Sequence, residues 1–258
     1  MKEFDRLIEI IEQLRDKENG CPWDVMQTHE SLIPNFIEEL YECIEAIENK
    51  DHSHLSEELG DLLLHIIMQV QIAKEESKFE MEEVLTKINE KLIRRHPHIF
   101  GDGHATDAAG VKMNWERIKL EEKKHSRTSA IDGIPQNMPA LIVAQRMQEK
   151  AASVGFDWSD LAPAVDKLEE EVKEFQEAYI HKDIKEMQNE LGDMIFSIVN
   201  IARKSGFDTE TALRGTIKKF ESRFKKVENH FKQNGKKMLD ASLEQLDEIW
   251  EITKKSEK

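Results

Sequence analysis

The sequence is poor in the residues that cross-link a chain or interrupt its helices. Only Cys21 and Cys43 are cysteines among 258 residues, which excludes a disulfide framework and indicates a reducing, cytoplasmic setting. Glycine and proline number 11 and 6, so turns should be few and helices long. Aromatic residues make up 7% of the chain, a low share for an all-β protein. These shortages favour an all-α fold.

Excess positive charge and long apolar runs are missing as well. The formal net charge is −15 and no basic stripe dominates, so binding to nucleic acid through its phosphates is not expected. The most apolar stretch, 62–70, is interrupted by His65 and Gln69 and is far too short to span a bilayer. The charged N-terminus lacks the apolar core of a secretory signal. Neither a membrane partner nor export is therefore expected.

The clearest feature that is present is an internal repeat with an offset of 132 residues. Residues 38–42 and 58–61 read EELYE and ELGD, and residues 170–174 and 190–193 read EEVKE and ELGD. An apolar segment follows each ELGD, and a helix with a basic end comes next. A fixed offset over several motifs indicates two copies of one structural unit.

The repeat predicts two domains joined by a short linker. Each copy closes with a WExxKxxEK segment, which begins at Trp115 and at Trp250. Between the copies, 126–138 has turn-forming residues and no helical period. The predicted organisation is an N-terminal domain over 1–125, a linker over 126–138 and a C-terminal domain over 139–258.

Apolar residues in both copies have the spacing of amphipathic helices. Breaks at 49–51 and 181–183 end these helices, and Asp183 followed by Glu186 resembles an N-cap with a capping-box partner. Second helices then run to about 76 and 204. Each copy should therefore contain two antiparallel helices joined by a tight turn, then a third helix and the Trp-bearing helix. The expected architecture is an all-α bundle with an internal repeat.

The carboxylates of each copy have the spacing of a metal site. Residues three apart on a helix share a face, and an antiparallel hairpin brings two such pairs together. Carboxylates this close repel one another unless a cation binds, and oxygen ligands suit Mg²⁺, or Mn²⁺ as a substitute. A solvated acidic face would explain one copy, but identical spacing in two argues against it. The predicted ligands are Glu39, Glu42, Glu58 and Asp61 in the first copy and Glu171, Glu174, Glu190 and Asp193 in the second.

Basic and aromatic residues in both copies could bind other parts of a phosphorylated ligand. Basic residues three or four apart on a helix could hold phosphate oxygens, although surface cations would look the same in isolation. Tryptophans could stack on a base, or could be core or interface residues. The candidates are Lys91, Arg94, Arg95 and Trp115 in the first copy and Lys219, Arg223 and Trp250 in the second.

Other metal and nucleotide motifs are incomplete. Only Glu122-x-x-His125 has the Glu-x-x-His spacing of a di-iron site. His65, within an apolar helix, is expected to be a core histidine with its hydrogen bonds satisfied. The sequence has no GxxxxGK[ST] phosphate-binding loop. The repeated carboxylates therefore carry the functional prediction.

Taken together, these motifs resemble the MazG family within the all-α nucleoside triphosphate pyrophosphohydrolases. EExxE followed at this distance by ExxD is similar to the family signature, and residues 20–32 and 149–158 resemble the starts of a first and a second MazG domain. The resemblance implies a tandem repeat of two MazG-like helical bundles, completed by homodimerisation. It also implies Mg²⁺-dependent hydrolysis of nucleoside triphosphates to a monophosphate and pyrophosphate.

The resemblance further implies roles for individual residues. Lys219 and Arg223 match phosphate contacts, and 167–171 and 186–189 flank the nucleotide. We also predict that Glu38 or Glu170 orients the attacking water as general base. The implied nucleotide contacts in the second copy are Lys167, Leu168, Glu169, Glu170, Glu171, Glu186, Met187, Gln188, Asn189, Asp193, Lys219, Arg223 and Trp250.

Three alternatives stay open at this point. The substrate could be narrower, as in dUTPase-like or phosphoribosyl-ATP pyrophosphatase activity, or the chain could be a non-catalytic helical regulator. Retention of both carboxylate sets argues against the regulator. One departure from symmetry is a loop: Phe79 lies 18 residues after Asp61, whereas Phe207 lies 14 after Asp193. We expect the second copy, where the matched residues are most complete, to do most of the catalysis.

Overall fold

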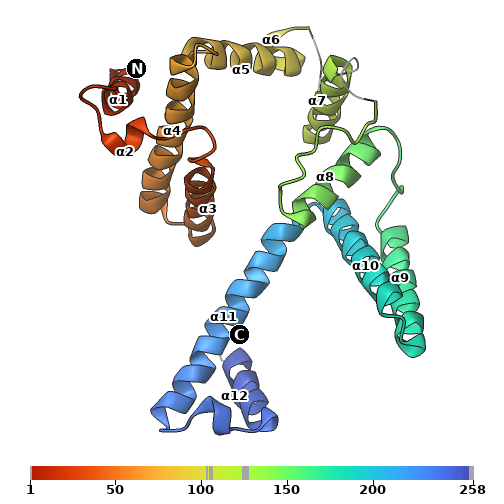
Figure 1. Cartoon of the computed structure of the whole chain (residues 1–258). Coiled ribbons are helices and arrows are strands. Elements are labelled where there is room, and N and C mark those ends of the chain that lie inside the picture. Colours follow the sequence, from red (N-terminus) through yellow and green to blue (C-terminus); the bar gives the residue numbers. More distant parts are fainter. Residues whose placement is uncertain (1, 103, 105–106, 124–127, 256–258) are drawn as a thin grey trace. The chain divides into compact units, whose positions relative to one another are not determined.

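The computed structural model describes residues 2–102, 104, 107–123 and 128–255 (Figure 1). Every regular element among them is a helix, which confirms the all-α prediction. None of these helices is both long and apolar enough to cross a bilayer. The chain divides into two compact units, Met1–Ala105 and Thr106–Lys258. The predicted linker falls inside the second unit, and the predicted domain boundaries stay a prediction.

The first unit is built around a long helical hairpin. Its α3 and α4 lie side by side, and α1 packs on the C-terminal half of α4 (Figure 1). The helices are α1 (Lys2–Leu14), α2 (Pro22–Val25), α3 (Ile33–Asn49), α4 (His52–Glu75), α5 (Met81–Arg95) and α6 (Pro97–Phe100).

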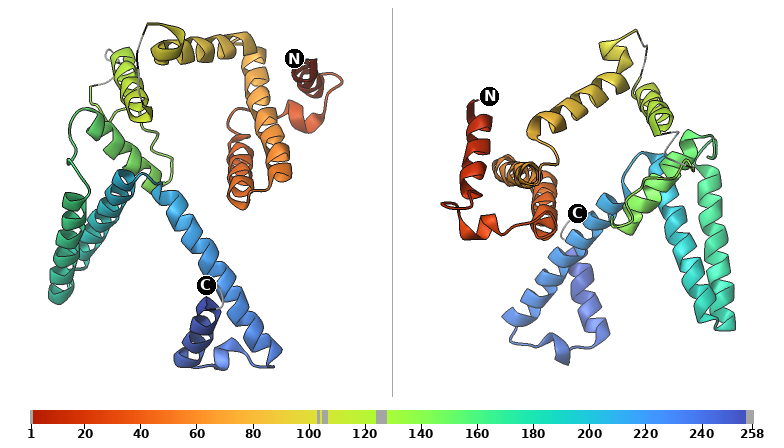
Figure 2. Two further views of the ribbon diagram at one scale, coloured as in Figure 1. Left: turned by 180° about the vertical axis from the view of Figure 1, so that it is seen from behind. Right: turned by 45° about the horizontal axis from the view of Figure 1, so that its top comes forward.

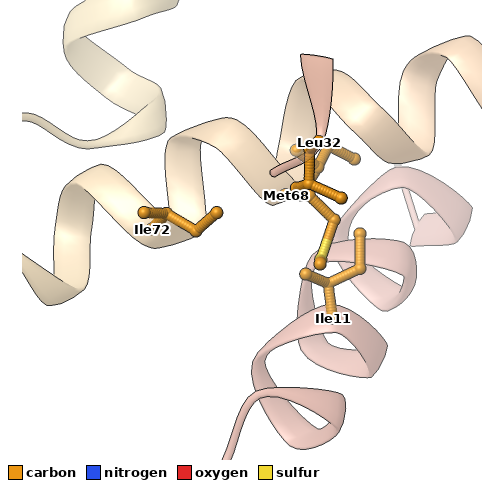
Figure 3. Packing of buried hydrophobic residues seen from close by; sticks show 5 residues of the cluster. Ile11, Leu32, Met68 and Ile72 are labelled. Atoms are coloured by element: carbon orange, nitrogen blue, oxygen red, sulfur yellow. The ribbon is translucent and has the colours of Figure 1, made fainter. Parts of the chain in front are cut away.

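The core of this unit lies where α1 meets α4. Ile11 and Leu32 are fully buried against Met68 and Ile72 of α4 (Figure 3). Arg15 donates two hydrogen bonds, of 2.8 and 2.7 Å, to the Glu75 carboxylate. A bidentate pair of this kind fixes the angle between two helices as well as their separation. The core thus holds α4 rigid at the end away from its carboxylates.

The second unit repeats the hairpin and extends it. Its α9 and α10 lie side by side, α8 packs against α10, and α11 pairs with α12. The elements are α7 (Ala108–Lys123), α8 (Ala140–Ser153), α9 (Ala162–His181), α10 (Ile184–Ser205), α11 (Thr209–Gln233), the short 3₁₀ helix η1 (Met238–Asp240) and α12 (Leu243–Lys255). Within this unit, the α9–α10 and α11–α12 hairpins extend in different directions (Figures 1 and 2).

The turns of the two hairpins are built in the same way. Lys50 and Lys182 end α3 and α9 in the left-handed conformation, with φ of 56° and 59°. Asp51 and Asp183 then cap α4 and α10 by accepting backbone N–H groups from the first turn. The predicted N-cap at Asp183 is confirmed. Its expected capping-box partner Glu186 instead accepts a 3.2 Å hydrogen bond from Asn189.

Candidate functional site

The second hairpin gathers three of the predicted metal ligands. Oxygens of Glu171 and Glu174 on α9 and Glu190 on α10 all lie within 4.8 Å of one another. Glu171 and Glu190 are only 5% and 9% exposed, whereas Glu174 faces solvent. Asp193, the fourth predicted ligand, lies outside this close group and lines the cavity beside it. The group of Glu171, Glu174 and Glu190 is called the second carboxylate group below.

A lysine and a buried acid give this group its electrostatic character. Lys167 Nζ lies 2.7 Å from Glu171 Oε1 and 2.8 Å from Glu170 Oε1, and this pairing lowers the pKa of Glu171. Burial, followed by the charges of Glu174 and Glu186, raises the pKa of Glu190 to about 7. Glu190 is therefore partly protonated at neutral pH, beside an ionised Glu171.

Glu190 also carries an unsatisfied atom. Its Oε2 is buried and accepts no hydrogen bond within the described part of the chain. An unpaired buried carboxylate oxygen is costly, and a hard divalent cation is the kind of group that satisfies it. The residues present therefore fit a Mg²⁺ or Mn²⁺ ion.

An apolar cavity of about 640 Å³ adjoins the second carboxylate group. Glu171, Asp193 and Lys167 form part of its wall. The rest is mainly apolar and includes aromatic side chains from the segment before α9 and from α10. The aromatic side chains are Phe156 and Trp158 from that segment and Phe196 from α10. Met147 and the amide of Gln148, both on α8, also line the cavity.

Sequence patterns do not reveal this cavity. In the sequence, Phe156 and Trp158 stand only as part of a motif that resembles a domain start. The available signal in the sequence is the pair of aromatic residues on either side of Asp157, and the structure leaves Phe156 82% exposed. Asp157 between them is held by Arg203 at 2.6 Å and by Lys204 at 3.3 Å, both from the end of α10. These ion pairs fix the aromatic segment against the hairpin.

The first hairpin gathers a slightly different set. Oxygens of Glu39 on α3 and of Glu58 and Asp61 on α4 lie within 4.8 Å of one another, and Glu42 is outside this close group. Burial and then the charge of Asp61 raise the pKa of Glu39. Burial and then the charge of Glu42 raise the pKa of Glu58. Glu39, Glu58 and Asp61 are called the first carboxylate group below.

Two histidines approach the first carboxylate group. His54 Nδ1 lies 3.1 Å from Glu58 Oε1, and His65 Nε2 lies 3.8 Å from Glu39 Oε1. His65 is buried, as predicted, and burial lowers its pKa so that the ring is neutral at neutral pH. The expectation that its hydrogen bonds are satisfied is wrong, because Nδ1 is buried without a partner among the described residues. Nε2 faces Glu39, which an apolar periodicity alone does not reveal.

The structure does not bring the predicted phosphate contacts to the carboxylates within a unit. Lys91, Arg94 and Arg95 lie on α5. This helix follows the C-terminal end of α4, which is the end far from α3 and the carboxylates (Figure 1). In the second unit, the Arg223 guanidinium carbon lies 6.0 Å from the ring centroid of Trp250 on α12. Lys219 and Arg223 therefore share the α11–α12 hairpin with Trp250. Trp115 is half-buried on α7.

The remaining implied nucleotide contacts divide into two sets. Glu186, Met187, Gln188 and Asn189 form the start of α10, one turn before Glu190. Leu168 and Glu169 instead line a separate shallow cavity on α9, of about 350 Å³.

Glu38 and Glu170, the proposed general bases, are both exposed beside their carboxylate groups. In the first unit, Phe79 of the longer loop lines a cavity of about 840 Å³ whose other walls are mostly charged.

Both carboxylate hairpins match known proteins. The family model described as "MazG nucleotide pyrophosphohydrolase domain" matches residues 27–100 and again 162–228. The chain is 47% identical over 251 residues to "Nucleoside triphosphate pyrophosphohydrolase/pyrophosphatase MazG" of Thermotoga maritima, covering 97% of this chain and 95% of that protein. It is 42% identical over 260 residues to "Nucleoside triphosphate pyrophosphohydrolase" of Escherichia coli K12, covering 100% and 99% of the two chains.

A solved structure is also similar to part of the chain. It is a mazG-related protein from Thermotoga maritima, with 29% identity and a TM-score of 0.39, and the match covers 45% of this chain and 97% of that one. The family model spans both hairpins, and the two relatives match over nearly their full lengths. The chain is therefore an enzyme of the MazG nucleotide pyrophosphohydrolase family, and it carries the family's domain twice.

Proposed function

We propose that the chain hydrolyses nucleoside triphosphates to nucleoside monophosphate and pyrophosphate at the second carboxylate group, with Mg²⁺ as cofactor and Mn²⁺ as a possible substitute. One observation carries the proposal: clustered carboxylates share a wall with an apolar cavity of about 640 Å³. Ligand pockets typically enclose about 300–1,000 Å³ and are mainly apolar with a few polar groups. The two halves of this site suit the two halves of a nucleotide.

The carboxylates would hold the metal ion and the α-phosphate end of the substrate. Glu171, Glu174 and Glu190 supply oxygens from both helices, and Asp193 adds a carboxylate at the cavity wall. A bound divalent cation would neutralise phosphate charge and lower the pKa of a coordinated water. Four carboxylates without a cation would repel a triphosphate, so substrate binding should require the metal.

Lys167 and Glu170 are placed for complementary tasks. Lys167 is paired with Glu171, and its flexible ammonium is free to bind a phosphate oxygen once a cation has replaced it there. Glu170 is exposed and lies beside Lys167, where its carboxylate can take the proton of the attacking water. Both residues come from one turn of α9, so the hairpin alone positions them.

The apolar cavity would hold the base and sugar. Phe156, Trp158 and Phe196 offer faces on which a base can stack, and stacking accepts any base. Gln148 donates to the Phe196 carbonyl at 2.8 Å, while its own buried Oε1 accepts no hydrogen bond from the described residues. That oxygen can accept an N–H or O–H from the bound nucleoside. The lining supports broad substrate use rather than a single base.

Homodimerisation is proposed from an apolar stripe on α11. Leu213, Ile217, Phe220 and Phe224 recur at four- and three-residue intervals and are 40–57% exposed. This is the spacing of a helix that packs against another helix. A second copy would cover the stripe, and Lys219 and Arg223 on the same helix could then reach the partner's substrate.

Size-exclusion chromatography with light scattering tests the dimer. Ile217→Lys places a charge in the stripe and should yield monomer, whereas the matched change Ser222→Lys, on an exposed position away from the stripe, should leave the dimer intact. A wild-type monomer at micromolar concentration would remove this part of the proposal.

The activity is tested by measuring monophosphate and pyrophosphate from a panel of triphosphates, with and without Mg²⁺. The panel includes the ribo- and deoxynucleotides, dUTP and phosphoribosyl-ATP. We expect equal amounts of the two products and broad acceptance. Release of diphosphate and phosphate would contradict the bond assignment, turnover of one substrate alone would favour a narrower enzyme, and no turnover would favour a regulator.

A further inference from the structure

One wall of the cavity beside the second carboxylate group is a short segment outside the helices. Residues 155–158 lie between α8 and α9, and Phe156 and Trp158 of this segment line the cavity. Gly155 ends α8 in the left-handed conformation, with φ of 89°, and turns the chain away from that helix. Both aromatic rings are exposed, so packing alone holds them only weakly.

Side chains from the end of α10 hold the segment instead. The Arg203 guanidinium donates two hydrogen bonds to the Asp157 carboxylate, of 3.1 Å to Oδ2 and 2.6 Å to Oδ1. Lys204 Nζ donates to Asp157 Oδ1 at 3.3 Å and to the Trp158 carbonyl at 2.8 Å. A bidentate pair fixes orientation as well as distance. The position of the two aromatic residues beside Asp157 is therefore set from α10.

Arg203 is itself held in one orientation. Its Nε and Nη2 donate to Asn200 Oδ1 at 3.1 and 2.7 Å. The side chains of Arg203 and Asp157 are partly buried, and salt screens such a pair less than it screens a surface pair. Burial alone would raise the pKa of Asp157, but the hydrogen bond and charge of Arg203 lower it below its usual value. The ion pair is therefore fully charged at neutral pH.

The first unit holds the corresponding segment through a different contact. Its tryptophan, Trp23, lies on α2, and Arg15 donates to the Asp24 backbone carbonyl at 2.5 Å. The carboxylate partner of Arg15 is Glu75 of α4. The arginine of the first unit thus binds the backbone of the segment, whereas Arg203 binds a side chain that one substitution can remove.

The ion pair lies where it can act on nucleoside binding. Asp157 and Arg203 both line the cavity, and Arg203 follows Asp193 by ten residues on α10, about 15 Å along the helix. We propose that Asp157 and Arg203 are positioning residues: their ion pair holds Phe156 and Trp158 as the wall on which the base stacks, and it sets nucleotide affinity rather than the rate of the chemical step. The inference rests on the proposed function in that the nucleoside is taken to occupy this cavity.

Loss of the ion pair should raise KM and leave kcat nearly unchanged, because the metal-binding carboxylates are left in place. Asp157→Ala releases both Arg203 and Lys204 and should raise KM on the order of tenfold, as expected for a displaced stacking face. Arg203→Met should have a smaller effect, since Lys204 still pairs with Asp157. Arg203→Lys keeps the charge without the two-pronged geometry and should fall between wild type and Arg203→Met.

The test combines steady-state pyrophosphate release with calorimetric titration of the full chain. The titrant is α,β-methylene ATP with Mg²⁺, which is not cleaved between the α and β phosphates, so affinity is read without turnover. The double variant of Asp157→Ala and Arg203→Met should lose no more affinity than Asp157→Ala, because both changes break one contact. Arg146→Gln is the matched control. It breaks an exposed ion pair with Glu149 on α8 and should change neither KM nor affinity.

Each outcome decides for or against the proposal. Weaker binding and a higher KM in Asp157→Ala, with kcat kept and no further loss in the double variant, support it. Unchanged affinity in Asp157→Ala overturns it, and so does a lower kcat at unchanged KM or a fully additive double variant. If thermal unfolding shows that Asp157→Ala does not fold, Arg203→Lys and Arg203→Met decide, and wild-type affinity in both overturns the proposal.

The binding measurement also separates this inference from the proposed reaction. A wild-type chain that binds the analogue but releases no pyrophosphate from triphosphates would overturn the reaction and leave the positioning role standing. A wild-type chain that does not bind the analogue would overturn both.

Discussion

The two hairpins share a backbone and differ in what faces their carboxylates. Both end their first helix on a left-handed lysine, Lys50 or Lys182, and both cap their second helix with an aspartate. The second carboxylate group pairs with Lys167 and opens onto an aromatic cavity. The first is flanked instead by two histidines. Turn and cap chemistry thus fixes the scaffold, while the side chains that face the carboxylates differ between the two copies.

The largest difference between the copies should appear when one buried carboxylate is neutralised in each. Glu190→Gln removes a central metal ligand of the second group and should lower pyrophosphate release on the order of 100-fold or more, because several kcal/mol of transition-state stabilisation depend on the metal. Glu58→Gln is the matched change in the first group and should cause a far smaller loss. Steady-state kinetics at saturating Mg²⁺ measures both. Equal losses would show that the copies do not divide the work as proposed.

Removal of one cavity tryptophan should have the next largest effect. Trp158→Ala deletes a stacking face and should raise KM about 10-fold, since a base–aromatic stack contributes about 1–3 kcal/mol. The control is Trp23→Ala, which changes the tryptophan of the corresponding motif in the first unit, where it is 54% exposed. KM should not change in that control. An unchanged KM in Trp158→Ala would place the base elsewhere.

Much of the scaffold follows from sequence because its signals are local. Helical periodicity, the cap at Asp183 and the fixed spacing of ExxE and ExxD depend on neighbours within a few residues, and the structure confirms the helices and that cap. The close grouping of Glu171 with Glu190 required only that the hairpin be antiparallel.

The parts that sequence did not reveal depend on tertiary packing. Phe156 and Trp158 line the cavity only because Arg203 and Lys204 hold Asp157 against α10, 46 and 47 positions further along the chain. His65 looked like a core residue because its helix is apolar, yet its ring turns towards Glu39 of α3. Trp250 lies away from the carboxylates of the second unit because of the direction in which α11 runs. Tertiary packing sets that direction, and the spacing of residues along the sequence does not predict it.

The glycine of each ELGD motif gives a smaller contrast. An added Cβ at Gly60 or Gly192 would meet no described atom within 4 Å, so alanine fits at both positions. Each Gly→Ala change should stabilise its helix by about 0.5–1 kcal/mol through helix propensity. Gly192 lies directly before Asp193, so a methyl group there should also hinder a ligand or partner that approaches the site.

Urea unfolding and steady-state kinetics test the two glycines together. Activity should fall only in Gly192→Ala, while both variants gain stability. If Gly192→Ala gains stability with full activity, no ligand or partner approaches this face closely.

The smallest predicted effect concerns proton and metal binding at Glu190. Its pKa rises from 4.5 to about 7 on folding, so between these values the folded chain holds a proton that the unfolded chain has lost. Without divalent metal, this group should therefore lower the free energy of unfolding as the pH rises through that window, and the loss is complete above about pH 7. Mg²⁺ replaces the proton and should remove the decline. Thermal unfolding from about pH 5 to about pH 8 measures the effect.

Glu190→Gln, which cannot ionise, should show a shallower metal-free decline, and a profile equal to wild type would mean that another group titrates there. Because the pKa values of Glu39, Glu58 and Glu174 are also raised, a decline that persists in this variant reports on these three carboxylates.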